Sequence, residues 1–519
     1  MLIFVLCFIS VFSGAQSWSW ASGPTSNAYS ISEAMATDAA GNTYITGKAT
    51  DSTWFGTHLL TGQGYYLFIA KYTSSGICAW ASSYAPLVNG FGLAIDANGN
   101  SFVLGQRAGI DSILKWDPSG NLLWAKPLPS NAAGNYLTGD PSGNIWVCGR
   151  ITSGSAVFGS ATIVGPAGFA AKFDLNGNAL LAFQLGFNDK ILPRYMAVDA
   201  NGDISIAASL YGNDSLANQA LTCLGSSLLV IRLDASGNLT WLKQGVAPPN
   251  LTAHAGPFGL CLDPLGNCYV NAVFMFHDFI FDYDTVHTST LSQRTAAIIK
   301  FDANGNVDWL RQSTNAGTGD VYFMSIVSDS NAVYFTGYSE DNFTLGPHTI
   351  IDTSNTYHLG YIIGMDFSGN PLFEMCTSGN NSLIGPNGIS VDAFGGVYIS
   401  GYRDHGINFG PFNLPVTNGG DAFVAKLQLS PASVVEFSSA YNVVLLPTEN
   451  ARTFMLRFGE TSLDLHTRFV LYDGTGRVVK TILAAPQTLV DCRDLADGIY
   501  YWSVENNADR FATGKLVNQ

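Results

Sequence analysis

A motif of nine or ten residues that returns seven times is the feature that most limits how this chain can fold. The copies read DAAGNTYITG from Asp38, DANGNSFVLG from Asp96, DPSGNIWVCG from Asp140, DANGDISIAA from Asp199, DPLGNCYVNA from Asp263, DSNAVYFTG from Asp329 and DAFGGVYISG from Asp392. In most copies Asp-x-x-Gly separates two runs of β-branched and aromatic residues. The Asp carboxylate can accept from backbone N–H groups a few residues on, and Gly supplies the positive φ of a tight turn. Each copy therefore predicts a β-hairpin.

A second motif alternates with the first and predicts a second hairpin. In six complete copies a large residue lies four positions after the turn glycine: Trp80, Trp124, Leu181, Trp241, Trp309 and Phe373. Two hairpins give four strands per repeat, and the motif Asp residues are 44 to 66 positions apart. Four short strands at this period are typical of a β-propeller blade.

The seventh copy of the second motif is incomplete, and its missing strand is found at the other end of the chain. It begins at Ala422–Leu427 and never reaches its aromatic strand. Near the N-terminus, SWSWASG aligns Trp20-Ala21 with Trp80-Ala81. An N-terminal strand that completes the last blade would leave no open sheet edge. We therefore predict an all-β fold: a seven-bladed β-propeller over residues 16–430, closed by the N-terminal strand and followed by a small β-sandwich.

The repeat also resembles a known family. The order DxxGNxYVTG, then a segment such as Ile407–Leu427, then DxSGNxxW is similar to the bacterial β-propeller repeats of secreted and surface proteins. The resemblance spans roughly residues 17–428 and implies the propeller fold. It does not imply an activity, because propellers host many unrelated functions.

After a predicted linker at residues 431–442, the pattern changes. Residues 443–519 hold short alternating strands separated by glycine turns, which predicts the small β-sandwich. Three segments, LYDGTGRVV, LADGIYYWSV and GKLVNQ, resemble the type A C-terminal sorting domain of the type IX secretion system. The motif positions are Gly476, Gly498, Tyr500 and Lys515. Where that family usually opens with Pro-Asn-Pro, this chain has LPTEN at residues 446–450.

The resemblance implies a partner and a route. The type IX secretion machinery would carry the protein through the outer membrane, for release or for attachment to the cell surface. An ordinary sandwich without a sorting role is the alternative. Residues 1–15, an apolar run that ends in small residues, predict a signal peptide. The run is shorter than the ~20 residues a membrane span needs, so no transmembrane segment is predicted in the mature chain. The predicted location is secreted or on the outer cell surface.

The charge of the chain limits its possible partners, and its cysteine content indicates how the thiols are placed. The chain has 24 Lys and Arg against 39 Asp and Glu, a formal net charge of −15, which argues against a nucleic-acid partner. Seven cysteines would remain after cleavage, and most are expected to be buried thiols. Cys261 and Cys268 flank one hairpin turn and form the local pair to test for a disulfide.

No catalytic, metal or cofactor site is assigned from the sequence. HExxH, GxSxG and phosphate-binding glycine loops do not occur in it. The segment FHDFIFDYDTVH carries His277, Asp282 and Asp284, which could bind a metal or simply decorate a solvated loop. The motif Asp residues fit turn capping better than a calcium loop, because Gly stands fourth rather than sixth. The repeated tryptophans are expected in the core.

Two tryptophans and several long segments are the candidates for ligand binding. Trp54 and Trp116 are aromatic residues outside the repeat pattern, and the long segments between hairpins in blades four to six are the favoured loops. We expect a non-enzymatic binding or adhesion protein for a glycan or a protein. A secreted polysaccharide hydrolase or lyase is the first alternative, and a structural surface-layer spacer is the second.

Overall fold

The computed structural model divides the chain into two compact units. One unit is Ser17–Gln428, and Leu429–Gln519 belong to the other. The structure describes residues 16–518 except 27, 86, 108–109, 289–292, 316, 318, 347, 352–356, 380–382, 416–418, 430–442, 448–451, 459–466, 474–476, 486, 497 and 506–509. The predicted signal peptide and the predicted linker therefore lie outside the described residues. In the described part of the chain all named elements are β-strands, and no helix there is long and apolar enough to cross a membrane.

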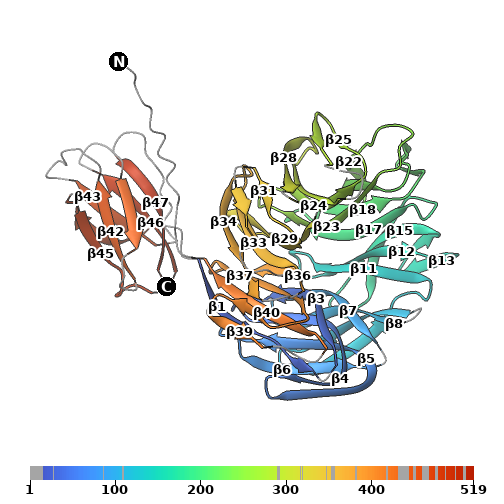
Figure 1. Ribbon diagram of the computed structural model, residues 1–519, viewed down its shortest axis with the longest axis horizontal. Helices are drawn as coiled ribbons and strands as arrows, with labels where there is room; N and C mark the ends of the chain where they lie inside the picture. Colours follow the sequence, from blue (N-terminus) through green and yellow to red (C-terminus); the bar gives the residue numbers. More distant parts are fainter. Residues whose placement is uncertain are drawn as a thin grey trace. The chain divides into compact units, whose positions relative to one another are not determined.

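Within the described residues, the larger unit contains seven sheets that each have a core of four antiparallel strands (Figure 1). The first three comprise β3 (Ser30–Thr37), β4 (Thr43–Phe55), β5 (His58–Tyr72) and β6 (Cys78–Tyr84); β7 (Asn89–Ile95), β8 (Ser101–Arg107), β9 (Ile110–Trp116) and β10 (Leu122–Pro127); β11 (Ala132–Gly139), β12 (Ile145–Ile151), β15 (Ala167–Phe173) and β16 (Ala179–Leu185). The next three comprise β17 (Ile191–Val198), β18 (Ile204–Leu210), β21 (Ser227–Leu233) and β22 (Leu239–Gln244); β23 (His254–Leu262), β24 (Cys268–Met275), β27 (Thr295–Phe301) and β28 (Val307–Asn315); β29 (Val321–Ser328), β30 (Ala332–Ser339), β33 (Leu359–Asp366) and β34 (Pro371–Cys376). The last comprises β36 (Ile384–Val391), β37 (Gly396–Arg403), β40 (Asp421–Gln428) and β1 (Ser17–Ser22).

Short strands lie between the second and third strands of most sheets. They are β13 (Ser155–Phe158) with β14 (Ala161–Val164), β19 (Asp214–Leu216) with β20 (Gln219–Leu221), β25 (Phe279–Phe281) with β26 (Asp284–Val286), β31 (Phe343–Leu345) with β32 (His348–Ile350), and β38 (Ile407–Phe409) with β39 (Phe412–Leu414). Two further pieces, β2 (Thr25–Ser26) and β35 (Ser378–Gly379), pair with β4 and β38. Only residues 108 and 109 separate β8 from β9. This sheet lies in the shortest repeat, in which Asp96 and Asp140 are 44 positions apart.

Both sequence motifs form hairpins, as predicted. Thr37 of β3 pairs with Thr43 of β4, and Asp38 caps the turn between them: its Oδ1 accepts from Ala40 N at 3.0 Å and Asn42 N at 2.9 Å. Gly41 has φ +76°. In the second motif, Asp117 accepts in the same way from the backbone N–H groups two and four positions on. We call these capped turns the Asp turns.

The first strands of the sheets contact one another in order. β3 contacts β7, and the contacts continue through β11, β17, β23, β29 and β36, which contacts β3. The N-terminal strand β1 pairs with β40, with Ser17 opposite Gln428. The larger unit is thus an all-β propeller, and we call each of its four-stranded sheet cores a blade.

Tryptophans of the fourth strands pack across the gaps between blades. An added Cβ on Gly76 would stand 2.6 Å from the Trp20 ring, and Trp20 Nε1 donates to Ser74 O at 2.9 Å. The same contact, with the same 2.6 Å approach, joins Trp241 to Gly305 of the next blade. The predicted core position is confirmed at Trp20 and Trp241, which are both 8% exposed. Glycine is required at this turn for two reasons. Its φ is positive, and the tryptophan ring that covers it leaves no space for a Cβ atom.

Cys261 and Cys268 pack on different faces of their sheet. Cys261 belongs to the core cluster that contains Phe323 and Phe335, whereas Cys268 belongs to the cluster that contains Ala207 and Leu228. A disulfide requires the two Cβ atoms to approach and face each other. The geometry therefore does not support a disulfide at this pair.

In its described residues, the C-terminal unit contains two antiparallel sheets. One has the order β41 (Val443–Pro447), β42 (Thr453–Phe458) and β45 (Gln487–Asp491); the other has the order β44 (Val478–Leu483), β43 (Arg468–Tyr472), β46 (Gly498–Glu505) and β47 (Arg510–Asn518). Residues from both sheets, including Leu456, Phe469 and Trp502, share one buried cluster. Alternating strands with one apolar face produce such packing.

Candidate functional site

The first strand of every blade has a β-bulge at the same place. The bulged residues, which we call the bulge ring, are Glu33, Phe91, Asn135, Arg194, Phe258, Met324 and Asn387. Each lies five positions before the Asp of the first motif. A bulge inserts an extra residue into one strand and redirects its side chain, and bulges are frequent beside functional sites.

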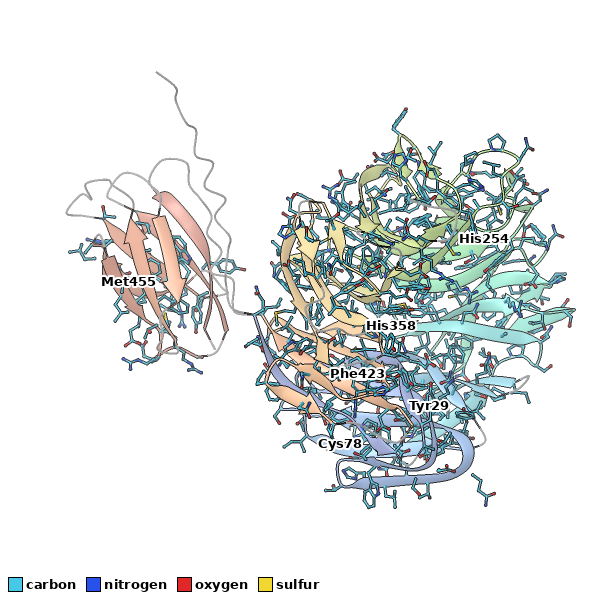
Figure 2. The ribbon with its side chains drawn as sticks, viewed as in Figure 1. Tyr29, Cys78, His254, His358, Phe423 and Met455 are labelled. Carbon is cyan, nitrogen blue, oxygen red and sulfur yellow. The ribbon has the colours of Figure 1, made fainter. Side chains whose placement is uncertain are left out.

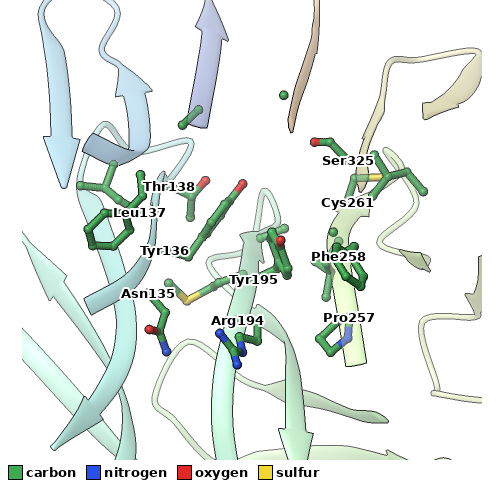
Figure 3. Close-up of a pocket in the computed structure, with 18 of the residues that line it drawn as sticks. Asn135, Tyr136, Leu137, Thr138, Arg194, Tyr195, Pro257, Phe258, Cys261 and Ser325 are labelled. Atoms are coloured by element: carbon green, nitrogen blue, oxygen red, sulfur yellow. The ribbon is translucent and has the colours of Figure 1, made fainter. Parts of the chain in front are cut away.

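A cavity of about 820 Å³ lies between the first strands of the blades. Residues from β3, β7, β11, β17, β23, β29 and β36 line it, and they include every bulge-ring residue except Met324. Figure 3 shows Asn135, Tyr136, Arg194, Tyr195 and Phe258 on the wall of this cavity. We call it the central cavity.

One wall of the central cavity presents hydrogen-bond acceptors. Glu33 and Asn89 lie here on neighbouring strands. Burial raises the pKa of Glu33, while the charge of Lys48 and a hydrogen bond to Asn89 oppose the shift. The Oδ1 atom of Asn89 is buried and has no hydrogen-bond partner among the described residues. A buried acceptor without a partner favours a ligand that brings a donor.

Another part of the wall presents donors and aromatic rings. Arg194 is exposed to the cavity, and no hydrogen bond or ion pair to its guanidinium is found in the part of the chain that the structure describes. Beside it, Asn135 Nδ2 donates to Pro193 O at 2.8 Å. The Tyr136 and Tyr195 rings lie 5.3 Å apart. Burial raises the pKa of Tyr195 to about 12; Arg194 lowers it and Glu33 raises it, so both charges act on this hydroxyl.

Stacked aromatic side chains extend from the bulge ring toward the strand ends opposite the Asp turns. Phe258 lies edge-on to Tyr322 at 6.2 Å, Tyr322 stacks on Tyr338 at 4.6 Å, and Tyr338 stacks on His358 at 4.4 Å. The Arg294 guanidinium lies 5.4 Å from the Tyr322 ring centre. Burial lowers the pKa of His358, against the effect of nearby Glu340. His358 appears near the middle of the larger unit in Figure 2.

A second aromatic group lies at the same end of the strands, beside β3. The Tyr29 ring is 5.5 Å from Tyr402 and 6.3 Å from Tyr65. Lys48 Nζ lies over both Tyr29 and Tyr65, at 5.9 and 5.7 Å from their ring centres. Burial, then Tyr402 and Glu33, raise the pKa of Tyr29 to about 12. Lys48 and Glu33 thus connect this group to the acceptor wall of the central cavity.

The two tryptophans proposed as binding residues from the sequence differ in their exposure. Trp54 is 47% exposed and lies near the end of β4, where it pairs with Leu59. Trp116 is 0% exposed and its Nε1 faces Ser82 Oγ at 3.3 Å. A fully buried ring offers no surface to a ligand, so the suggestion of Trp116 as a binding residue is wrong. Neither tryptophan lines the central cavity.

The acidic and histidine residues of the β25–β26 arm do not converge. Asp282 is exposed and pairs with Lys243 Nζ at 2.7 Å, while exposed Asp284 lies in a different, shallow pocket beside Lys300 and Asp308. His277 is half-buried, and its backbone N–H donates to Met275 O at 3.0 Å. Within the described residues no group of three or more His, Cys, Asp or Glu side chains is placed to hold a metal ion.

The sorting-motif positions are spread over the second sheet of the C-terminal unit. Gly498 is the first residue of β46, and Lys515 of β47 pairs with Tyr501. Tyr500 is buried and its hydroxyl donates to Ala496 O at 2.9 Å. Gly476 lies outside the described residues.

The sequence interpretation favoured loops and missed the bulge ring. The central cavity is lined mainly by the first strands and not by the long arms. A signal was present: the position five before each motif Asp has a fixed spacing but carries five residue types over seven repeats. A position that repeats in place and varies in chemistry is a candidate for recognition.

No protein family model matches the chain, and no curated protein matches it either. Among solved structures, a streptogramin B lyase is similar at 12% identity and a TM-score of 0.40, over 78% of this chain and 93% of that one. The Neurospora crassa Pan2 WD40 domain is similar at 11% identity and a TM-score of 0.41, over 78% and 90%. PorZ, a surface component of the type IX secretion system of Porphyromonas gingivalis, is similar at 11% identity and a TM-score of 0.37. That alignment covers 95% of this chain and 59% of PorZ. Likenesses at these identities and TM-scores support no inference about function.

Proposed function

We propose that this chain is a non-enzymatic binding or adhesion protein, secreted or held at the cell surface, and that it binds a glycan at the central cavity. The observation that carries the proposal is the bulge ring, which supplies six side chains of four kinds (Glu, Phe, Asn and Arg) to the cavity wall. Aromatic faces can pack on the apolar faces of sugar rings, and amide, carboxylate and guanidinium groups can bind sugar hydroxyls. A concave site with aromatic walls and a few convergent polar groups is the usual form of a ligand site.

We propose that the binding unit is a seven-bladed ring closed by the N-terminal strand. The pairing of β1 with β40 supports the closure. The contact of β36 with β3 supports it independently. A closed ring would hold the bulge-ring side chains at fixed distances from one another, which preorganises a binding site.

The route to the cell surface is part of the same proposal. Residues 1–15 would be a cleaved signal peptide, residues 16–430 the propeller and 431–442 a linker, and residues 443–519 would direct export by the type IX secretion machinery. The sequence motifs of the C-terminal unit support this. Removal of residues 443–519 should leave the protein in the periplasm of a host with that machinery. Normal appearance of the truncated protein outside the cell would contradict the sorting role.

A polysaccharide hydrolase or lyase is the second candidate, and Glu33 favours it. Burial raises the pKa of this carboxyl, a property of general acids in glycosidases. A glycan cleaved by the wild-type protein and left intact by Glu33→Gln would establish this candidate. If the protein binds neither glycans nor proteins, the structural surface-layer spacer is the remaining candidate.

The test is retention of a panel of immobilised glycans by the full mature chain, with every eluted glycan checked by mass for cleavage. We expect one class to bind intact. Tyr136→Ala, which removes an aromatic ring from the wall of the central cavity, should weaken binding by roughly fivefold, because an aromatic pair contributes about 1 kcal/mol. Tyr283→Ala is the matched control, since Tyr283 is fully exposed on the β25–β26 arm. Equal weakening by both variants, or none by either, would contradict a site at the central cavity.

A further inference from the structure

Arg194 is the bulge-ring residue of β17 and lies on the wall of the central cavity (Figure 3). It is the only Lys or Arg among the described residues that line the central cavity. Cations of other sheets have partners within the fold: half-buried Lys172 pairs with Asp140 at 2.8 Å, and buried Lys426 pairs with Asp392 at 3.1 Å. The Arg194 guanidinium has no such partner in the described part of the chain. Its planar set of N–H donors fits a carboxylate with two parallel hydrogen bonds.

Glu33 lies across the central cavity from Arg194. Their strands, β3 and β17, are separated by β7 and β11 in one direction and by β23, β29 and β36 in the other. Arg194 lowers and Glu33 raises the pKa of Tyr195, whose side chain also lines the cavity. The cavity therefore has a donor wall at Arg194 and an acceptor wall at Glu33 and Asn89.

Neutral hydrogen-bond donors of a ligand fit the acceptor wall better than a second cation does. Lys48 already acts on the Glu33 charge, and Asn89 Oδ1 has no partner among the described residues. Hydroxyl groups fit both Glu33 and Asn89, because each supplies one O–H donor without adding charge. A second anionic group on the ligand would lie beside Glu33, where like charges repel.

We propose that the central cavity binds an acidic glycan of the uronate type, with its carboxylate on Arg194 and its hydroxyl groups on Glu33 and Asn89. This inference rests on the proposed glycan-binding function and specifies its ligand class. The chain has a net charge of −15, so its overall field does not attract anions. Recognition must then come from short-range donors inside the cavity, and Arg194 supplies them.

The experiment measures the binding of galacturonic acid, which carries one carboxylate, and of its methyl ester to the full mature chain, by calorimetry at one ionic strength. Esterification removes the charge and keeps the sugar ring. We expect the free acid to bind about tenfold or more tightly than the ester, because hydrogen bonds to charged groups are roughly twice as strong as neutral ones. Arg194→Gln should abolish this preference and leave weak binding of the ester unchanged.

Arg150→Gln is the control, because Arg150 is an exposed arginine of the same unit that does not line the cavity. Should Arg194→Gln fold poorly, Glu33→Gln tests the opposite wall: it keeps an acceptor and removes a charge, so uronate binding should hold or tighten. Equal affinity for acid and ester, or a loss in Glu33→Gln as large as that in Arg194→Gln, would overturn the inference and leave glycan binding standing. Equal binding of an oligoglutamate peptide would also overturn it. A chain that binds no glycan of the panel would refute the proposed function itself.

Discussion

Two positions of each repeat lie five residues apart, one at the bulge of the first strand and one in the turn that follows it, and they differ in how much their residue type varies. At the Asp turn the aspartate recurs in all seven copies, because its carboxylate must accept from the turn N–H groups. At the bulge the residue changes from acid to aromatic ring, amide, guanidinium and thioether. The turn maintains the blade, and the bulge presents a side chain to the cavity. A repeat protein can thus vary its recognition surface without altering the hairpins that hold the ring.

Deletion of residues 17–23 should have the largest effect. It removes β1, the fourth strand of the last sheet, together with buried Trp18 and Trp20. Loss of a buried Trp commonly costs about 3–5 kcal/mol, so the propeller should lose at least about 5 kcal/mol of stability. Thermal unfolding followed by circular dichroism measures this. A variant in which the same seven positions carry Gly and Ser controls for chain length, and an unchanged melting temperature in both would rule out closure by this strand.

A direct test of the comparison sets Asp392→Ala against Asn387→Ala. Asp392 accepts from Phe394 N, Gly396 N and the Tyr398 hydroxyl and pairs with Lys426. Removing it leaves a buried cation unpaired, which should cost about 3–5 kcal/mol. Asn387 makes one hydrogen bond, to Ser32 O, and its loss should cost about 1 kcal/mol. Urea unfolding measures the free energy of unfolding of both variants. Similar losses of stability at the two positions would show that the bulge residue is as important for the fold as the turn residue.

Gly305→Ala and Gly143→Ala separate the two demands on turn glycines. Both residues have positive φ, +85° and +84°. At Gly305 an added Cβ would stand 2.6 Å from the Trp241 ring, whereas at Gly143 it meets nothing within 4 Å. Gly143→Ala should cost about 1 kcal/mol of backbone strain, and Gly305→Ala clearly more. Equal melting temperatures would show that the tryptophan moves aside freely.

The smallest effect should appear in the pH dependence of Glu33→Gln. The folded-state pKa of Glu33 is raised, so its stabilising contribution is present below the unfolded value of about 4.3 and lost as pH rises through the folded value. The stability of Glu33→Gln relative to wild type should therefore increase as pH rises above the unfolded pKa of about 4.3. Asn387→Asp, which places an acid in the bulge ring instead of removing one, should show the opposite trend. A pH-independent difference for Glu33→Gln would mean that Lys48 fully offsets the burial of the carboxyl.

The sequence predicted the parts of this molecule that depend on local chemistry. Asp-x-x-Gly turns, alternating strands and the tryptophan four residues after a glycine are set within one hairpin, so they can be recognised without a structure. Contacts between blades could not be recognised in this way. Trp116 was expected to be accessible to a ligand because it lies outside the repeat pattern, but it packs against the neighbouring sheet and is buried. The aromatic stack from Phe258 to His358 spans a hundred residues of sequence and exists only after the blades assemble.

The pairing of β1 with β40 also bears on mechanical load. The chain leaves this sheet at Leu429, directly after β40, which is hydrogen-bonded to β37 on one side and β1 on the other. Tension applied from the C-terminal side is shared by two ladders. Tension applied at Gln16 would act on β1 alone and peel it from Ser17 onward, one hydrogen bond at a time. A propeller that must hold its ligand under flow is therefore better anchored through its C-terminal end.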